Sequence, residues 1–438
     1  MSRPVRVVLV ILGVLVLLAA AAGLFVWIKI AGLKDRLVTE LGKSLDAQVQ
    51  ISSVAFDPWK GEMRVAGISL ISQKPSAPWD KAQLSQAVLH FHLADAFSSH
   101  IPVTIEASGW NIVFHSRTGT AEASYTAALP ESIPAEPPSR KVDVTKIVAL
   151  DGSAEIDFSP DRKVFFHDVR FNAESNGAGV WTTDVHLGSL VAGTLKSGEC
   201  AVEIRAETEK ISFTGLRMQV DPGVITGEGE VTLSGQHDAK VSIKAADVPV
   251  TMLVSVDWQM KLSGQLNGTL QYKGNDQGGD AKGSITVTHG KFNVLPWLGK
   301  LTAMAGLQDI TDVEVDTETA DYTWKDHALH LSNIDIRKTD VTRISGTVDV
   351  APNGQVDGKL KLGLPSSITA KWPQVQTQVF STQQDDYNWA DVHLTGTSDN
   401  LHEDLTPRLL AAGMSSGGDL YNQATQKASD LYHSIFGK

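Results

Sequence analysis

Cysteine is nearly absent from this sequence: Cys200 is the only one among 438 residues. A single cysteine cannot form a disulfide within the chain, and it leaves a cysteine-based zinc site without its other ligands. Basic clusters are lacking as well. The net charge is −12, and no run of lysine and arginine stands out that would bind nucleic-acid phosphates. These absences exclude a disulfide-stabilised scaffold and argue against a nucleic-acid partner.

Motifs of catalysis are also missing. The sequence contains no Gly-x-Ser-x-Gly nucleophile turn and no glycine-rich phosphate loop ending in Lys-Ser or Lys-Thr. Neither a serine nor the lone cysteine is paired with a positioned histidine and acid. The glycine-rich phrases stand at the ends of predicted strands, where turns explain them. We therefore predict a protein that is not an enzyme and carries no cofactor.

Two groups of residues have the chemistry of metal ligands but not their arrangement. Four carboxylates alternate along one predicted strand: Asp312, Glu314, Asp316 and Glu318. Neighbours on one face of a strand stand about 6.6 Å apart, which is too open to surround a cation, so we predict a solvated face. His90 and His92 share the face of another strand without a third ligand. We predict no metal site.

Long apolar runs are rare in this chain, and one stands out. Residues 7–28 contain no charge, side-chain amide or proline. As a helix, this run reaches roughly 33 Å, against about 30 Å of bilayer hydrocarbon. We therefore predict a transmembrane anchor over residues 1–30. Its positions include Val7, Leu15, Leu24, Trp27 and Ile28.

The anchor has one alternative interpretation, a cleaved signal peptide, since residues 19–23 are small enough to suit a peptidase. The apolar run continues through 24–28 and is longer than a typical signal core, which favours an uncleaved anchor. Basic residues flank the run on both sides in similar number, so charge does not decide the orientation. A short cytoplasmic N-terminus with an exported domain is the usual outcome. We predict a single-pass protein of a bacterial inner membrane with the bulk of the chain in the periplasm.

The anchor is followed by a change of period. Leu33, Leu37, Leu41 and Leu45 recur every fourth residue among charges, which predicts an amphipathic helix. This helix would cover one end of a sheet, lie at the membrane surface, or do both. From residue 47 onward a period of two dominates, so the fold class we predict is mainly β. It consists of an elongated, curved antiparallel sheet that forms a groove, with a few short capping helices.

Composition divides the chain further. The helix and the first strands occupy 31–126, and 127–141 is a proline-rich connector of extended form. A long strand-rich domain covers 142–399, and 400–438 carries helical spacing interrupted at 417–418. Pro296 is expected to open another short helix within the strand-rich domain.

The clearest strand pattern runs over 258–273. Its apolar residues fall on one face and its polar residues on the other, which predicts a long antiparallel strand with one wet face. The apolar set is Trp258, Met260, Leu262, Gly264, Leu266, Gly268, Leu270 and Tyr272. The two glycines suit a bend or a close approach. The alternative is two ordinary strands of a closed sandwich joined by a glycine turn.

These features together resemble the AsmA-like family of bacterial inner-membrane proteins. The resemblance covers most of the chain in order, without one invariant motif. At the N-terminus it rests on the span, the leucine helix and Ile51-Ser52-Ser53-Val54-Ala55-Phe56-Asp57-Pro58-Trp59. In the centre it rests on 147–158 and 166–169. The C-terminal match is the best and covers 290–293, 313–315, 329–331, 344–350 and 392–396.

The resemblance implies a periplasmic β-groove that takes part in phospholipid transport or outer-membrane biogenesis and is related to bridge-like lipid carriers. It implies no catalytic residues. The partners expected are membrane lipids, phospholipid above all. Under this hypothesis acyl chains contact Trp258, Met260, Leu262, Leu266, Leu270 and Tyr272. The alternative is a membrane-tethered structural or regulatory scaffold with a closed β-sandwich that docks envelope-assembly proteins. The lipid, its direction of movement and any energy source are left open by the sequence.

Overall fold

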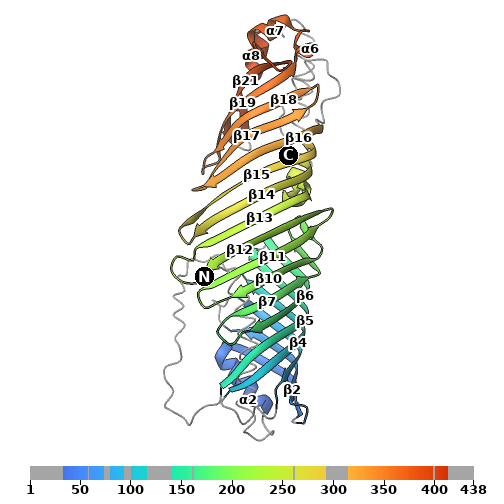
Figure 1. The fold of residues 1–438 in the computed structure, drawn as a ribbon, viewed down its shortest axis with the longest axis vertical. Helices are drawn as coiled ribbons and strands as arrows, with labels where there is room; N and C mark the ends of the chain where they lie inside the picture. Colours follow the sequence, from blue (N-terminus) through green and yellow to red (C-terminus); the bar gives the residue numbers. More distant parts are fainter. Residues whose placement is uncertain are drawn as a thin grey trace. The chain divides into compact units, whose positions relative to one another are not determined.

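The computed structural model describes residues 33–57, 59–73, 79–92, 100–115, 141–159, 162–259, 262–292, 314–397 and 400–412. The fold is mainly β, as predicted, with open, curved and predominantly antiparallel sheet and a few short helices (Figure 1). The predicted span at 7–28 lies outside the described residues. Within the described ranges, no helix is both long enough and apolar enough to cross a bilayer.

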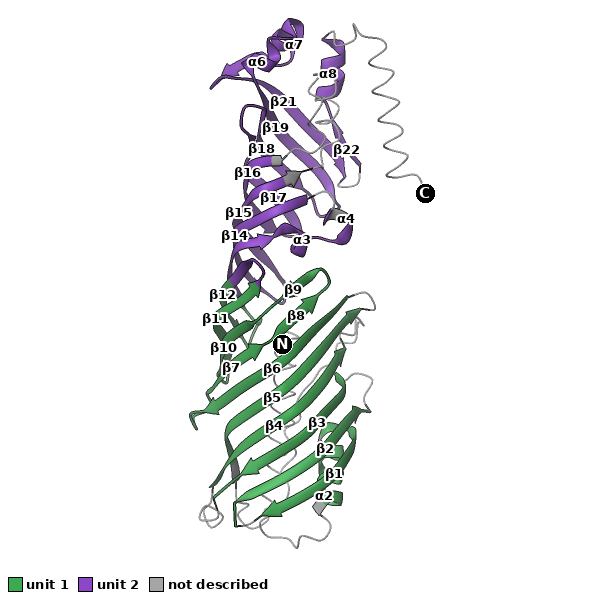
Figure 2. Cartoon of the chain, turned by 90° about the vertical axis from the view of Figure 1, so that its right-hand side faces the viewer, with its two compact units in different colours: residues 1–219, 226–238 green, residues 220–225, 239–438 purple. Residues whose placement is uncertain are grey.

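Contacts divide the chain into two compact units (Figure 2). Unit 1 comprises residues 1–219 and 226–238, and unit 2 comprises 220–225 and 239–438. The strand β12 (Gly223–Thr232) contributes residues to both.

The described part of unit 1 starts with helix α2 (Leu33–Leu45), which is followed by a series of strands. These are β1 (Ala47–Asp57), β2 (Glu62–Ser72), β3 (Trp79–His90), β4 (His100–His115), β5 (Lys141–Ser159), β6 (Arg162–Ser175), β7 (Trp181–Leu187), β8 (Ser189–Ala192), β9 (Leu195–Ser197), β10 (Cys200–Ala206) and β11 (Lys210–Val220). Neighbours from β1 to β4 pair in chain order and antiparallel. β5 is parallel to β4, with His100 opposite Lys141 and His115 opposite Asp157. The predicted connector at 127–141 lies outside the described residues except for Lys141, which already belongs to β5.

The sheet of unit 1 divides after β6. One half of β6 pairs with β7 and the other half with β8. β8 continues into the short β9, whereas β7 is followed in the sheet by β10 and then β11. All these pairs are antiparallel.

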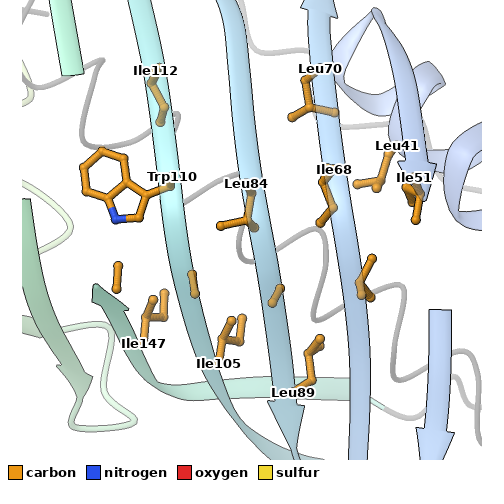
Figure 3. Packing of buried hydrophobic residues seen from close by; sticks show 14 of the residues in the cluster. Leu41, Ile51, Ile68, Leu70, Leu84, Leu89, Ile105, Trp110, Ile112 and Ile147 are labelled. Atoms are coloured by element: carbon orange, nitrogen blue, oxygen red, sulfur yellow. The ribbon is translucent and has the colours of Figure 1, made fainter. Parts of the chain in front are cut away.

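The core of unit 1 lies on one face of the sheet, and helix α2 packs at its β1 end. Leu37 and Leu41 of α2 are each only 2% exposed, and Lys34 Nζ donates a 3.3 Å hydrogen bond to Ser52 O of β1. The leucine helix therefore covers one end of the sheet, which confirms one of its two predicted roles. The buried side chains of the sheet point to one side (Figure 3). They include Ile51, Ile68, Leu84, Leu89, Ile105, Ile112 and Ile147.

Left-handed residues interrupt the strands of unit 1 at successive positions. They are Gly67 in β2, Gly109 in β4, Asp151 in β5 and Asp168 in β6. In β4 the buried positions are odd-numbered up to Ala107 and even-numbered from Trp110 onward. A left-handed residue takes one position out of the alternation and bends its strand. The curvature of the sheet has this local origin.

Unit 2 repeats the same construction. Its strands are β13 (Ala239–Pro249), β14 (Leu262–Asn275), β15 (Gly278–Phe292), β16 (Glu314–Lys325), β17 (Ala328–Lys338), β18 (Thr342–Val350), β19 (Gln355–Pro365), β20 (Thr382–Gln384), β21 (Tyr387–Thr397) and β22 (Asn400–Glu403). Its helices are α3 (Val250–Leu253), α4 (Val256–Gln259), α6 (Ser366–Thr369), α7 (Pro373–Gln378) and α8 (Leu405–Ala411). β13 to β19 pair in chain order, and β21 pairs with β19, β20 and β22.

The far end of unit 2 has a closed core. Leu362 of β19 and Phe380 are each 1% exposed, and Leu405 and Leu409 of α8 pack in the same cluster. Helix α8 agrees with the helical spacing predicted after residue 400. The predicted helix opened by Pro296 and the helical segment beyond residue 412 lie outside the described residues.

Candidate functional site

The strand predicted over 258–273 is a single strand, β14, from Leu262 onward. The alternative of two strands with a glycine turn is therefore wrong. The predicted beginning is also wrong, because Trp258 belongs to helix α4. The partner strand β13 ends at Pro249, which pairs with Gln265. Residues before 262 therefore have no β13 residue with which to form strand hydrogen bonds. Met260 lies outside the described residues.

The two glycines of the predicted apolar set, Gly264 and Gly268, bend strand β14 and bring the neighbouring backbone close. Gly264 has a φ of +124°, and the register with β15 shifts between Ser263 and Gln265. A Cβ at Gly268 would lie 2.9 Å from Ser284 O of β15. The predicted bend and close approach both occur, and the group that approaches is the adjacent strand.

The remaining predicted residues of β14 form part of a wider apolar surface. Leu266 stands opposite Val248 and Val287, and Leu270 stands opposite Ile243. Their shared side of strands β13 to β17 is called here the apolar face of unit 2. It comprises Val241, Ile243, Leu266, Leu270, Tyr272, Ile285, Val287, Tyr322, Trp324, Leu329 and Leu331.

Most of this apolar face is only partly covered by the described chain. Leu266, Leu270 and Tyr272 are half-buried, and none of them belongs to either hydrophobic core cluster of the described residues. One row of paired residues shows the transition to the closed core. It runs across the sheet through Leu266, Val287, Glu318, Ile336, Ile344 and Leu362. The same side of one sheet is thus closed near α8 and partly open at β14.

Tyr322 contributes an aromatic surface that the strand pattern of 258–273 does not reveal. Its ring crosses Gly283, since a Cβ there would lie 2.8 Å from Tyr322 Oη. The hydroxyl donates a 3.0 Å hydrogen bond to Thr269 O, so its polar end is satisfied. Partial burial raises the pKa of the Tyr322 phenol. Alternating Ala320, Tyr322 and Trp324 carried the signal in the sequence.

Glu318 overturns the prediction of a solvated acidic strand face. It stands opposite Val287 and Ile336, and burial raises the pKa of its carboxyl to about 7. A Cβ at Gly290 would lie 2.7 Å from Glu318 Oε1 and 3.3 Å from Val315 Cγ2, so both side chains border the same small space. Strict alternation along a strand would place residues 315 and 318 on opposite faces of the sheet. The alternation of side chains in β16 is therefore interrupted between these two positions.

Asp316 remains solvated, unlike Glu318. Its carboxylate accepts a 2.7 Å hydrogen bond from the Thr339 backbone N–H. That bond, helped by the nearby charge of Lys338, lowers the pKa of Asp316. The side chains of Asp312 and Glu314 lie outside the described residues. The four acidic residues therefore do not act as one surface.

Of the two histidines singled out in the sequence, His90 lies beside a carboxylate, as does His330 of β17. His90 Nε2 lies 3.5 Å from Glu106 Oε2, and His330 Nδ1 lies 2.5 Å from Asp349 Oδ1. In the described ranges no three side chains of histidine, cysteine, aspartate or glutamate gather as metal ligands would.

The apolar face of unit 2 is the strongest candidate site.

Comparison with known proteins does not name a family. No protein-family model matches the chain, and no curated protein does either. The resemblance to the AsmA-like family therefore stays a prediction from the residues that carry it. Function has to be argued from the geometry of the apolar face.

Proposed function

We propose that this protein is a membrane-anchored, lipid-handling protein whose apolar face in unit 2 shelters acyl chains. In this proposal residues 7–28 hold it in the inner membrane, and the sheet lies in the periplasm and takes part in phospholipid transport or outer-membrane biogenesis. The face acts by contact and not by reaction. This is the role that the AsmA-like resemblance implies.

One observation carries the proposal: apolar side chains of five adjacent strands remain half-buried on an open sheet. Exposed apolar surface costs roughly 25 cal/mol per Å², so a face of this composition is stabilised by an apolar occupant. Each methylene that an acyl chain buries returns about 0.8 kcal/mol. A hydrocarbon chain fits this requirement without any specific polar contact.

The dimensions agree with such an occupant. Five strands spaced by about 4.8 Å extend the face by roughly 19 Å across the sheet. One leaflet of a bilayer provides about 15 Å of hydrocarbon. An acyl chain lying across β13 to β17 would therefore contact the apolar face over its whole length.

The direct test is photo-crosslinking from two neighbouring positions of β14 in the full-length protein in its membrane. A benzoylphenylalanine at Leu270 faces the apolar side, and one at Gln271 faces the solvated side. The proposal expects lipid adducts at 270 and few at 271, read by mass spectrometry. Adducts to another protein at 270 would support the scaffold alternative, and no lipid adduct at 270 would overturn the proposal.

Localisation is tested separately. Alkaline phosphatase fused after residue 438 should be active, because it folds only after export, while green fluorescent protein at the same position should be dark. An inactive phosphatase with a bright fluorescent fusion would place the sheet in the cytoplasm.

A further inference from the structure

Glu318 is a carboxyl group set within an otherwise apolar row. Val287 of β15 and Ile336 of β17 flank it in register, and Leu266 lies one strand further along. Val287 is 9% exposed and Val315 is 3% exposed, so the immediate surroundings are closely packed. The Oε1 atom points to the space that the absent side chain of Gly290 leaves free.

No described cation neutralises this carboxyl. Lys338, on the adjacent strand, acts on Asp316, and Asp335 binds Arg343 Nε at 2.7 Å. Desolvation alone accounts for the raised pKa of Glu318, with no opposing charge. Burying an unpaired carboxylate is unfavourable unless a partner compensates it. Among the described residues the protein provides no such partner.

We propose that Glu318 receives the ammonium group of an amine-bearing lipid, such as a phosphatidylethanolamine, whose acyl chains lie on the apolar face. This inference rests on the proposed function. An ammonium group supplies both the opposite charge and hydrogen-bond donors that a carboxylate in apolar surroundings lacks. A lipid whose headgroup carries only negative charge would be repelled at the same position.

The neighbourhood favours a lipid over a soluble amine. The side chains around the carboxyl, Val287, Val315 and Ile336, are aliphatic. A ligand here must place an ammonium group against the carboxyl and hydrocarbon on the neighbouring apolar face. An amine-bearing lipid meets both requirements, whereas a soluble amine meets only the first.

The experiment uses the full-length protein with benzoylphenylalanine at Leu270, reconstituted in vesicles of equimolar phosphatidylethanolamine and phosphatidylglycerol with identical acyl chains. Mass spectrometry reads the ratio of the two adducts. We expect the ethanolamine lipid to be favoured about ten- to a hundredfold, as one charge-assisted hydrogen bond in a partly dry site would give. Glu318→Gln should bring the ratio close to one while the total adduct persists.

Two further variants make the test specific. Asp280→Asn removes one negative charge from an exposed position of β15 and should leave the ratio unchanged. Glu318→Met removes the charge with a side chain of similar length, and it replaces the glutamine variant if that one does not fold. An unchanged ratio in a folded Glu318 variant overturns the role of Glu318 alone. Absence of any lipid adduct at 270 in the parent protein overturns the proposed function itself.

Discussion

Ser85 Oγ donates a 3.0 Å hydrogen bond to Gly109 O across the β3–β4 pair, where Gly109 is left-handed with a φ of +63°. The same relationship recurs in the β1–β2 pair, where Ser52 Oγ donates a 3.3 Å hydrogen bond to Gly67 O and Gly67 has a φ of +62°. A serine hydroxyl thus meets a glycine carbonyl at each of these bends. Side chains and backbone conformation together fix where the strands curve.

Replacing Gly109 tests how strictly this bend requires glycine. A Cβ there would lie 2.4 Å from Ser85 Oγ and 2.8 Å from Ser85 Cβ, in a conformation that L-residues avoid. We expect Gly109→Ala to lower the free energy of unfolding by about 2–4 kcal/mol, from backbone strain and overlap together. Urea unfolding of the full-length protein measures the change.

Gly215 of β11 provides the matched control for Gly109. Its φ is +61°, but a Cβ there would meet nothing within 4 Å. Gly215→Ala should therefore cost only the backbone strain, about 1–2 kcal/mol. Equal losses at the two positions would show that the contact with Ser85 has no energetic weight.

A second prediction concerns the open and closed parts of unit 2. Leu266 is half-buried on the apolar face, whereas Leu362 lies in the closed core at 1% exposure. Leu266→Asp should leave the sheet folded and reduce lipid adducts formed from position 270. Leu362→Asp should unfold this part of unit 2, because a buried unpaired charge costs several kcal/mol.

Circular dichroism and limited proteolysis separate the two outcomes for these leucine variants. If Leu266→Asp unfolds as completely as Leu362→Asp, position 266 is part of a closed core. That result would favour the scaffold alternative over a lipid-binding face.

Helix α2 supports a third prediction. Leu37 and Leu41 are buried against the sheet of unit 1, so Leu41→Ala should cost about 2–4 kcal/mol of unfolding free energy. Lys43→Ala, on the exposed side of the same helix, should change it by less than about 0.5 kcal/mol. Losses of similar size would mean that α2 does not cover the sheet in solution.

Much of this architecture could be predicted from the sequence. The periods of 3.6 for a helix and 2 for a strand show directly which residues face the core. The spacing of Leu37 and Leu41 predicted a covering helix, and Leu266 to Tyr272 predicted one face of a strand. The pattern misplaces Trp258 because a stretch of four residues is too short to distinguish the period of a strand from that of a short helix. Only the end of the partner strand at Pro249 decides between them.

The position of Glu318 could not be predicted for a different reason. Which face a residue occupies depends on every break in the alternation before it. The relevant break lies between Val315 and Glu318, beside Gly290 of another strand. Such a contact is non-local and leaves no mark on the local pattern. The left-handed conformation of Asp151 and Asp168 could not be predicted either, because most aspartates have a negative φ and the residue type alone does not reveal the exceptions.

Glu318 gives the last prediction, a dependence of stability on pH. Its pKa is about 7 in the folded chain against 4.5 for the free side chain. Between these values the folded state holds a proton that the unfolded state has lost. Its contribution to stability is therefore fully present below about pH 4.5 and is lost as the pH rises through about 7.

Glu318→Gln should remove this dependence. At pH 8 the variant should be more stable than the parent by at most about 3 kcal/mol, and at pH 4.5 the two should be nearly equal. Urea unfolding midpoints at the two pH values, measured in one detergent free of amine-bearing lipid, provide the comparison. The Asp280→Asn variant should have the same unfolding midpoint as the parent at both pH values. If the parent and Glu318→Gln differ by the same amount at pH 4.5 and pH 8, the carboxyl is solvated, and the apolar face does not desolvate it.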